Sequence, residues 1–360
     1  MALAPRRQRF LLGEKRTLCG ISDVIGTVAE TWLGRGQQSA YATACDVTSK
    51  GDTQPAVSVV LPTHNRAVWL QTAVKSVLEG VFEDMEVIVS NNGRWEDTRR
   101  LAEKTDDPRV RWIEQAPCGM LEHLLKVLHL ARGRYVAILH DDDWWHPHLL
   151  ASLIPPLEAH SEAVVAFADQ WRVNGQGTID LPGTEYASRQ SGRAILAAGI
   201  HQPFYDLAVR ESVPVPACAF RREAVSTEHI PLEVGGAYDI WLGYLLARTG
   251  AAAYYCPDRL VYLRTHESSD FAVTPIPNLL AAVGCQRRML RDTRLAQHRD
   301  ELRRRLAARE QGIGAALLRQ GSRSAARRHL GAAIRLEGTV KALGAWGASW
   351  VLPDFAIARL

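Results

Sequence analysis

Apolar and polar positions follow two different spacings between residues 57 and 139. Four short segments are continuously apolar or β-branched, which predicts buried strands at 57–61, 85–90, 110–114 and 135–139. In three intervening segments apolar residues recur every three or four positions, which predicts helices at 67–78, 96–104 and 120–131. Strands and helices that alternate in this way form right-handed βαβ units, so we expect a parallel sheet covered on both faces.

Polar side chains directly follow three of these strands. They are Thr63, Asn65 and Arg66 after the first strand, Asn91 and Asn92 after the second, and an aspartate triplet after the fourth. Because the carboxyl ends of parallel strands meet at one edge of a sheet, we expect the three clusters to converge on a nucleotide-type site. The chain has neither a GxGxxG motif nor a GxxxxGKS/T motif, so the pattern supports neither a dinucleotide fold nor a P-loop.

The aspartate triplet consists of Asp141, Asp142 and Asp143. Three adjacent carboxylates repel one another unless a cation lies among them, and such oxygen ligands suit Mg²⁺ or Mn²⁺. A solvated acidic turn is the alternative interpretation. The position of the triplet at the end of an apolar strand, with Trp144 and Trp145 after it, favours the metal site.

Composition and charge narrow the class of protein. Of the 360 residues 47% are hydrophobic and 23% are charged, which is typical of globular proteins. The formal net charge is +4, but residues 286–335 hold 14 arginines against 4 acidic residues. This stretch could attract nucleic acid, anionic lipid or a phosphorylated substrate, or it could be a solvated helix face. The six cysteines include no CxxC pair, which predicts reduced thiols in a cytoplasmic protein.

We divide the chain into three parts. Residues 1–55 are weakly patterned and end in a linker-like composition, so we expect an N-terminal extension. Residues 56–270 hold the predicted sheet. Residues 271–360 are predicted to be helical, with one antiparallel pair formed by residues 279–308 and 313–336.

Two later segments carry further candidate chemistry. Residues 235–250 have helical spacing, and Asp239 lies near their start, where the helix dipole favours an anion. An aspartate at this position is commonly only a cap. A strand predicted at 260–263 is followed by Arg264 and His266, and a histidine in such a place is commonly a surface residue.

Four segments together resemble glycosyltransferase family 2 of the GT-A fold: VSVVLPTHNR, VIVSNNG, GRYVAILHDDDWWHPHLL and AYDIWL. The first block, the Asp-rich block and their spacing make the resemblance specific. It implies an α/β GT-A fold with a mixed sheet flanked by helices, here followed by a helical C-terminal region. It also implies metal-dependent, inverting transfer of a sugar from a nucleotide-sugar donor.

The resemblance further implies which residues bind the donor: Pro62, Thr63, Asn65, Arg66, Asn91, Asn92, Asp141 and Arg264. Members of the family usually have an aspartate at the end of the second strand that binds the base or the ribose. This chain has Asn91 and Asn92 there, and an amide donates as well as accepts hydrogen bonds. Base recognition can therefore differ from the uridine preference that the family suggests.

The metal ligands that the resemblance implies are Asp141, Asp142, Asp143 and His266, with Mn²⁺ or Mg²⁺ as the ion. The triplet corresponds to the DxD region of the family, whose first acid falls on His140. Asp142 is the strongest candidate, and which two aspartates hold the ion stays open. Asp239 corresponds to the family's catalytic carboxylate, and it would accept the proton of the acceptor hydroxyl. Tyr238 takes the place of the acidic residue that usually precedes it.

We therefore predict a glycosyltransferase that uses a nucleotide-sugar, most simply a UDP-sugar, and a glycan or small-molecule acceptor. The alternatives are a catalytically inactive nucleotide-sugar-binding protein, and a nucleotidyltransferase or sugar-nucleotide hydrolase with the same metal site. We predict a cytoplasmic protein that contacts the inner face of the membrane peripherally through its basic C-terminal region. We also predict a homodimer and no nucleic-acid partner.

Overall fold

The computed structural model describes residues 54–351 except 268, 270–272 and 274, so the predicted N-terminal extension lies almost entirely outside the described residues. All seven elements predicted between residues 57 and 139 form within a few residues of their expected bounds. The strands are β1 (Val57–Thr63), β2 (Met85–Asn91), β3 (Val110–Glu114) and β4 (Tyr135–Ile138). The helices are α2 (Ala67–Leu78), α3 (Trp95–Lys104) and α4 (Met120–Leu128).

The second half of the sheet alternates with short helices. Its strands are β5 (Trp144–Trp145), β6 (Ala163–Val173), β7 (Gly199–His201), β8 (Cys218–Arg221) and β9 (Ala252–Arg264). Its α-helices are α5 (Leu149–Ala159), α6 (Leu181–Gln190), α7 (Tyr205–Val209) and α8 (Tyr238–Ala247), and the 3₁₀ segment η5 (Leu232–Ala237) leads into α8.

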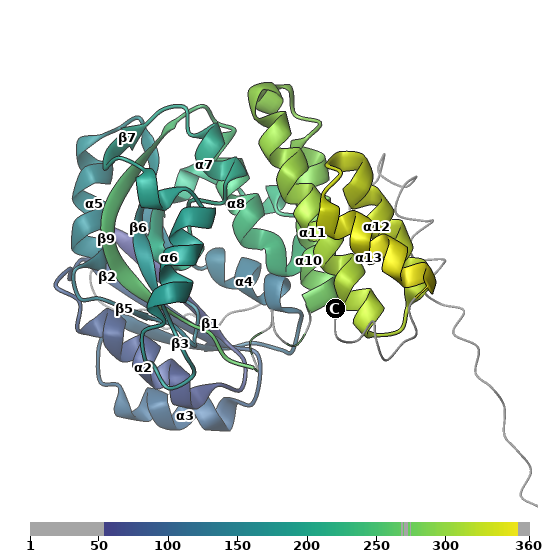
Figure 1. Ribbon diagram of the computed structural model, residues 1–360. Coiled ribbons are helices and arrows are strands. Elements are labelled where there is room, and N and C mark those ends of the chain that lie inside the picture. The colour runs from purple at the N-terminus through teal and green to yellow at the C-terminus, as the bar shows by residue number, and fades with distance from the viewer. Residues whose placement is uncertain (1–53, 268, 270–272, 274, 352–360) are drawn as a thin grey trace, which may run out of the picture. The chain divides into compact units, whose positions relative to one another are not determined.

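The described strands form one mixed sheet in the order β3-β2-β1-β4-β8-β6-β9-β5, and β7 also pairs with β9 (Figure 1). The first four strands are parallel, as predicted, whereas β8 is antiparallel to both of its neighbours. The register pairs Thr63 with Asn91, which brings the polar ends of β1 and β2 together. This architecture confirms the predicted mixed α/β sheet with flanking helices.

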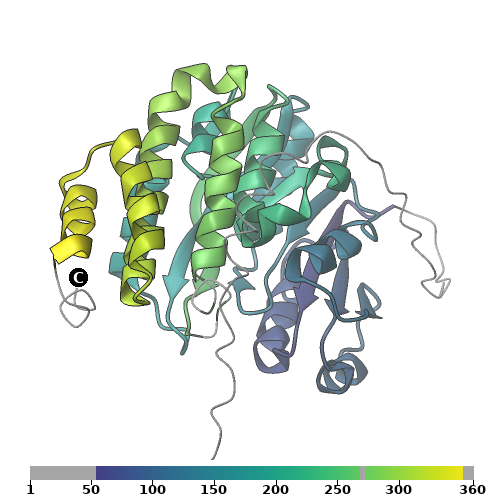
Figure 2. The same cartoon turned by 90° about the vertical axis from the view of Figure 1, so that its right-hand side faces the viewer.

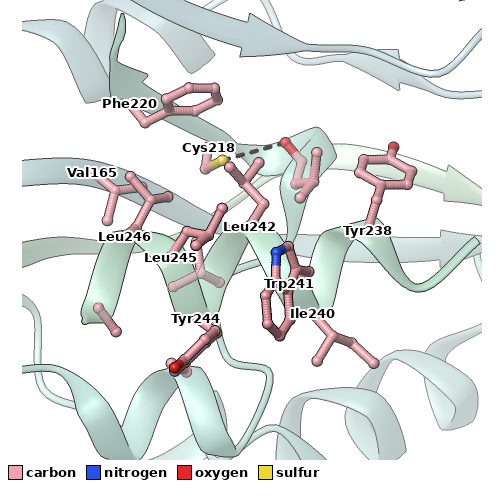
Figure 3. Close-up of a cluster of buried hydrophobic side chains, with 14 of the residues drawn as sticks. Val165, Cys218, Phe220, Tyr238, Ile240, Trp241, Leu242, Tyr244, Leu245 and Leu246 are labelled. Atoms are coloured by element: carbon pink, nitrogen blue, oxygen red, sulfur yellow. Dashed lines mark hydrogen bonds between the residues drawn. The ribbon is translucent and has the colours of Figure 1, made fainter. Parts of the chain in front are cut away.

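Helices cover both faces of this sheet, and its strands are apolar on both sides. Along β1 the buried side chains alternate between two hydrophobic clusters, with Val59 packed on the α2 and α5 side and Val60 on the α4 and α8 side. Such burial explains the continuous apolar runs that predicted the strands. Figure 3 shows part of the cluster on the α4 and α8 side, in which Leu242 and Leu246 of α8 lie near Phe220 of β8. Residues 240–247 are all buried, so packing fixes the position of α8. The first turn of the helix, at residues 238–239, is fixed with it.

The C-terminal region is helical, as predicted, but its division differs. The helices are α10 (Pro275–Met289), α11 (Arg299–Arg319), α12 (Arg323–Leu336) and α13 (Val340–Val351) (Figure 2). The continuous helix predicted at 279–308 is wrong, because the 3₁₀ segment η6 (Thr293–His298) interrupts it. Asp292 accepts a hydrogen bond from Arg294 N at 3.0 Å, and such side-chain bonds to the backbone compete with helix continuation.

The turn of the antiparallel pair lies at residues 320–322 instead of 309–312. Gly321 there has a positive φ of 76°, which favours glycine. Gly314 lies inside α11, where a Cβ would lie 2.6 Å from the Leu330 side chain of α12. The close packing of α11 on α12 therefore requires a glycine at this position. None of the described helices combines the length and apolar content that a membrane span requires.

Candidate functional site

The three predicted polar clusters meet at the carboxyl ends of β1, β2 and β4. Thr63 Oγ1 donates a hydrogen bond to Asp141 Oδ2 at 2.7 Å. Asn92 N donates to Thr63 O at 3.3 Å, and His64 Nδ1 lies 2.9 Å from Asn92 Oδ1. The convergence expected from the strand pattern is therefore present, and it is held by direct hydrogen bonds between the clusters.

Arg66 provides a positive charge within the aspartate triplet. Its Nη1 lies 3.2 Å from Asp141 Oδ1 and 3.2 Å from Asp142 Oδ2. Burial and the neighbouring charge of Asp142 nevertheless raise the pKa of the Asp141 carboxyl to about 6, against the opposite effects of Arg66 and Thr63. One guanidinium group thus offsets only part of the repulsion among these carboxylates, and a further cation would be favourable there.

One group of side chains in the described part of the chain could hold that cation. The possible ligand atoms of His140, Asp142 and Asp143 all lie within 4.8 Å of one another. Two carboxylates and a histidine in its neutral form are a donor set that fits a divalent ion such as Mn²⁺, and binding of the ion would release the proton of His140. Asp142 and Asp143 belong to the predicted ligands, whereas Asp141 faces Thr63 and Arg66 instead.

His266, the fourth predicted ligand, lies beside this group. Its Nε2 is 2.9 Å from Asp142 Oδ2, and its ring lies 4.1 Å from the Trp69 ring of α2, measured between centroids. We call the aspartate triplet together with His140 the acidic cluster. The structure brings His266 to this cluster, in contact with Asp142, the aspartate that sequence analysis favoured. Trp69 was not identified from the sequence, because nothing distinguishes it from a core tryptophan.

His140 connects the acidic cluster to α8. Its Nδ1 lies 3.4 Å from Asp143 Oδ2, and its Nε2 lies 2.5 Å from the hydroxyl oxygen of Tyr238. Burial lowers the pKa of His140, but Tyr238 and the carboxylates of Asp143 and Asp142 outweigh that effect and raise it well above its usual value. His140 and Tyr238 are two of the positions at which the chain departs from the acidic residues of the resembled family, and they contact each other.

Arg264 supports the acidic turn from the end of β9. Its backbone N–H donates to Asp143 Oδ1 at 2.8 Å, and its Nε donates to the carbonyl oxygen of Asp142 at 2.9 Å. The guanidinium carbon lies 4.8 Å from the Trp144 ring centroid and 5.6 Å from that of Trp69. Arg264 therefore positions the triplet, and its predicted contact with a phosphate stays a prediction.

The asparagines at the strand ends are bonded within the protein. Asn91 is buried, and its Nδ2 donates to Thr98 Oγ1 at 2.7 Å. Asn92 Nδ2 donates to Cys118 O at 2.9 Å. Asn65 adopts a positive φ of 57°, and its Oδ1 accepts a hydrogen bond from a backbone N–H across the loop. Together with Pro62 in β1, these residues shape the loops at the sheet edge, and their predicted contacts with a donor stay predictions.

The sequence Gly235-Gly236 positions Asp239. Gly235 has a φ of 44° that only glycine adopts readily, and a Cβ on Gly236 would lie 2.3 Å from Asn278 Oδ1. This kinked segment ends where α8 begins, so Asp239 lies in the first turn of the helix, as predicted. Asp239 Oδ1 accepts a hydrogen bond from the N–H of Ile240 at 2.7 Å.

Asp239 remains accessible to solvent but lies within a recess. The loss of surrounding water, together with the negative charge of Glu211, raises the pKa of the Asp239 carboxyl to about 6. Glu211 was not identified from the sequence. It is a non-glycine residue with a positive φ of 58°, a conformation that commonly marks functional positions and that leaves no sequence pattern.

Asp239 lines two adjoining pockets. One has a volume of about 400 Å³ and is also lined by Tyr238 and His140, so it extends from Asp239 to the histidine that contacts Asp143. The other has a volume of about 670 Å³ and is lined by Asp239 together with arginines of α11. A larger pocket of about 860 Å³ lies along β9 around Trp171 and contains none of the predicted site residues.

A mixed sheet whose parallel strands end at an acidic cluster, beside a pocket with a carboxylate, defines the GT-A class of fold. Solved structures of this fold agree. TarS of S. aureus, residues 1–349 in complex with UDP-GlcNAc, is similar with a TM-score of 0.61 and 14% identity, over 84% of this chain and 90% of that chain. Mannosyltransferase PcManGT from Pyrobaculum calidifontis, in complex with GDP-Man and Mn²⁺, is similar with a TM-score of 0.53 and 21% identity. The match covers 88% of this chain and 87% of that chain.

Sequence comparison shows what one part of the chain is similar to. Residues 58–201 match the family model for glycosyl transferase family 2. A similar curated relative is GalNAc(5)-diNAcBac-PP-undecaprenol beta-1,3-glucosyltransferase of Campylobacter jejuni, 35% identical over 25% of this chain and 30% of the relative. Another is the putative colanic acid biosynthesis glycosyl transferase WcaA of Escherichia coli, which is 29% identical over 32% of this chain and 40% of the relative. The match spans less than half the length of these relatives. Residues 58–201 therefore form a domain that is similar to glycosyl transferase family 2.

Proposed function

We propose that this protein is a metal-dependent, inverting glycosyltransferase that moves a sugar from a nucleotide-sugar, most simply a UDP-sugar, to a hydroxyl group of a glycan or small metabolite. One observation carries the proposal. The pocket of about 400 Å³ is lined by His140 of the acidic cluster and by Asp239. A sugar transferase needs a site for a departing diphosphate and a base for the incoming hydroxyl on opposite sides of one sugar-sized space.

The acidic cluster would hold a divalent ion, Mn²⁺ or Mg²⁺. Asp142 is the central ligand in this proposal, because it contacts His266 and belongs to the group with His140 and Asp143. When bound, such an ion supplies positive charge that stabilises a leaving nucleoside diphosphate. Arg66, which already lies between two of the carboxylates, would orient the same phosphates through charge-assisted hydrogen bonds.

Asp239 would act as the general base. A carboxylate accepts the proton best when its pKa lies near the working pH, and the pKa of Asp239 is raised to about 6. The N-terminal end of α8 is rigid because the helix behind it is buried, so the carboxylate keeps its position. Attack by the deprotonating hydroxyl from the face opposite the diphosphate would invert the anomeric centre.

The nucleoside would bind at the ends of β1 and β2, against Pro62, Thr63, Asn65, Asn91 and Asn92. Similar folds have been solved with UDP-GlcNAc and with GDP-Man, which supports a nucleotide-sugar donor without choosing the base. Because both asparagine amides bond to protein atoms, backbone groups would read much of the base.

A non-catalytic nucleotide-sugar-binding protein is the second candidate. One observation favours it: His140 and Tyr238 stand where the resembled family has acidic residues, and they bond to each other. A protein of this kind would bind the donor and leave it intact. The exposed carboxylate of Asp239, bonded only to the adjacent backbone N–H among the described residues, favours the enzyme.

The deciding experiment is a donor screen on the full chain. Thermal shift with UDP, GDP, dTDP and their sugars, with and without Mn²⁺, should give metal-dependent stabilisation by one nucleotide-sugar. Product analysis follows for that donor. Release of nucleoside diphosphate with transfer of the sugar supports the proposal. Nucleoside monophosphate, or free sugar alone, would indicate a nucleotidyltransferase or a hydrolase, and an intact donor would indicate a binding protein.

A peripheral membrane contact is also proposed, on the inner face of the cytoplasmic membrane. The outermost helix α13 exposes Leu343, Trp346 and Trp350, with 49%, 38% and 57% of their surface accessible (Figure 2). Arg327 of α12 lies over the Trp350 ring at 3.6 Å, so positive charge borders this apolar face. Tryptophan and arginine in this arrangement suit an anionic lipid surface. Co-sedimentation with phosphatidylglycerol vesicles, but not with phosphatidylcholine vesicles, would support the membrane contact. The predicted homodimer stays a prediction.

A further inference from the structure

We propose that the pocket of about 670 Å³ beside Asp239 binds an acceptor that carries a phosphate or diphosphate group. This inference rests on the proposed function, because it places the pocket on the acceptor side of that reaction. The pocket shares six lining residues with the pocket of about 400 Å³: Gln190, Glu211, Gly236, Asp239, Ile240 and Arg305. The two pockets therefore form one hollow, with the acidic cluster at one end and α11 at the other.

One face of α11 supplies positive charge to this pocket. Arg305 and Arg309 are one helical turn apart, about 6 Å along the axis. Their side chains are only 19% and 18% exposed. Arg305 donates to the carbonyl oxygen of Gln190 at 2.7 Å, which ties α11 to the end of α6. Arg304 of α11 and Arg189 of α6 line the same pocket.

Two glutamates hold the α11 arginines in position. Glu301 lies 2.7 Å from Arg304 and 2.8 Å from Arg305, in each case between a carboxylate oxygen and a guanidinium nitrogen. Glu211 lies 2.7 Å from Arg309 in the same sense. The guanidinium groups are thus oriented before any ligand binds, which reduces the entropy that a ligand must overcome.

The charge balance identifies the chemical class of the ligand. Among the described residues the side chain of Arg189 has no hydrogen bond or ion pair, so four arginines face three carboxylates, two from glutamates and one from the proposed base Asp239. A neutral sugar would leave the Arg189 guanidinium group and the excess positive charge to water, and a single carboxylate would engage only one arginine. A phosphate or diphosphate offers several oxygens to several arginines at once.

The arginines come from a part of the chain that the family match does not cover. The family model ends at residue 201, whereas Arg304, Arg305 and Arg309 lie about a hundred residues further on. Acceptor recognition by α11 is therefore a property of this chain's own helical region. It also gives a role to part of the arginine excess between residues 286 and 335.

The test measures binding of inorganic pyrophosphate to the full chain by isothermal titration calorimetry, without divalent metal. Arg304→Glu is the main variant, because this side chain is 58% exposed and its replacement should not disturb folding. We expect about tenfold weaker binding for Arg304→Glu and for Arg305→Gln, as for the loss of one charge-assisted hydrogen bond. Arg335→Gln, an exposed arginine on α12, should bind as the wild type does.

A second arm separates two sources of the same chemistry. Farnesyl diphosphate in detergent represents a lipid-linked diphosphate, and inorganic pyrophosphate represents a water-soluble phosphate. Tighter binding of farnesyl diphosphate would indicate a lipid-linked acceptor, and equal binding a soluble one. Either result supports the arginine site if the Arg304→Glu protein binds both compounds more weakly than the wild type.

The inference is overturned if the wild type does not bind pyrophosphate, or if folded Arg304→Glu and Arg305→Gln proteins both keep wild-type affinity. Melting temperatures establish that the variants are folded. Binding of UDP with Mn²⁺ is measured in parallel on the same protein. Its failure would refute the proposed function and leave the pyrophosphate result in place, so the two failures are distinguishable.

Discussion

The two ends of the hollow are built in different ways. At the proposed donor end, polar side chains bond to one another across strand ends, as Thr63 does to Asp141 and Arg264 to the triplet. At the proposed acceptor end the arginines of α11 are also paired, with glutamates, but Asp239 bonds only to the adjacent backbone N–H among the described residues. The donor end is thus fixed in advance, whereas the acceptor end keeps one carboxylate available. This difference suits a reaction in which one end binds a diphosphate and the other end accepts a proton.

The largest effect is expected at the donor end. Asp142→Ala removes the carboxylate that contacts both Arg66 and His266, so metal-dependent turnover should fall by about a thousandfold. Release of nucleoside diphosphate measures the rate. Asp300→Ala, at a side chain that is 93% exposed, is the control and should keep full activity. Unchanged turnover in Asp142→Ala would remove the acidic cluster from the mechanism.

The acceptor end is tested by Asp239→Asn. The amide keeps the shape but cannot accept the proton, so transfer should fall by about a hundredfold to ten-thousandfold while donor affinity stays the same. Donor affinity is measured by calorimetry and transfer by product analysis. Glu233→Gln, an exposed acid on the preceding 3₁₀ segment, is the matched control. Normal transfer by the Asp239→Asn protein would exclude Asp239 as the base.

The link between the two ends is tested by Tyr238→Phe. Loss of the hydroxyl removes the hydrogen bond to His140, and the metal concentration that gives half-maximal activity should rise by about tenfold. Tyr244→Phe is a matched control, since it removes a hydrogen bond to Asp292 from the other side of the same helix. Equal metal dependence of the two variants would show that His140 needs no partner.

The smallest effect is expected in the pH profile. A base must be deprotonated, so transfer should rise with pH through about 6, the pKa of Asp239, and level off above it. Glu211→Gln removes a negative charge that raises this pKa and leaves Arg309, which lowers it, without its partner. The rising limb should therefore move to lower pH. A limb that moves upward, or stays in place, would contradict the assignment.

The donor end was readable from the sequence for a local reason. Strands β1, β2 and β4 follow one another within about 80 residues, and each is buried on both faces. Their apolar runs, and the polar residues that end them, therefore appear as blocks. Convergence of Thr63, Asn92 and Asp141 followed from parallel pairing alone.

The acceptor end was only partly readable, because its residues come together through tertiary contacts. The helical pattern placed Asp239 near a helix start, but its role as the base was predicted only from the resemblance to the family. Glu211 lies on a turn, and Arg309 lies on a helix almost a hundred residues later, with no pattern that relates them. The helix break at residues 290–298 was missed for a similar reason, since one aspartate that caps a 3₁₀ turn looks like any polar helix residue.

The contact of Arg66 with two members of the triplet has a consequence for how the protein folds. A turn of three neighbouring carboxylates ordinarily depends on an external counter-ion for its conformation, and chelators unfold proteins that are built in that way. Here the polypeptide carries its own counter-ion. Chelation should therefore abolish activity without unfolding the protein. A preparation stripped of divalent ions should regain activity as soon as the ions are restored.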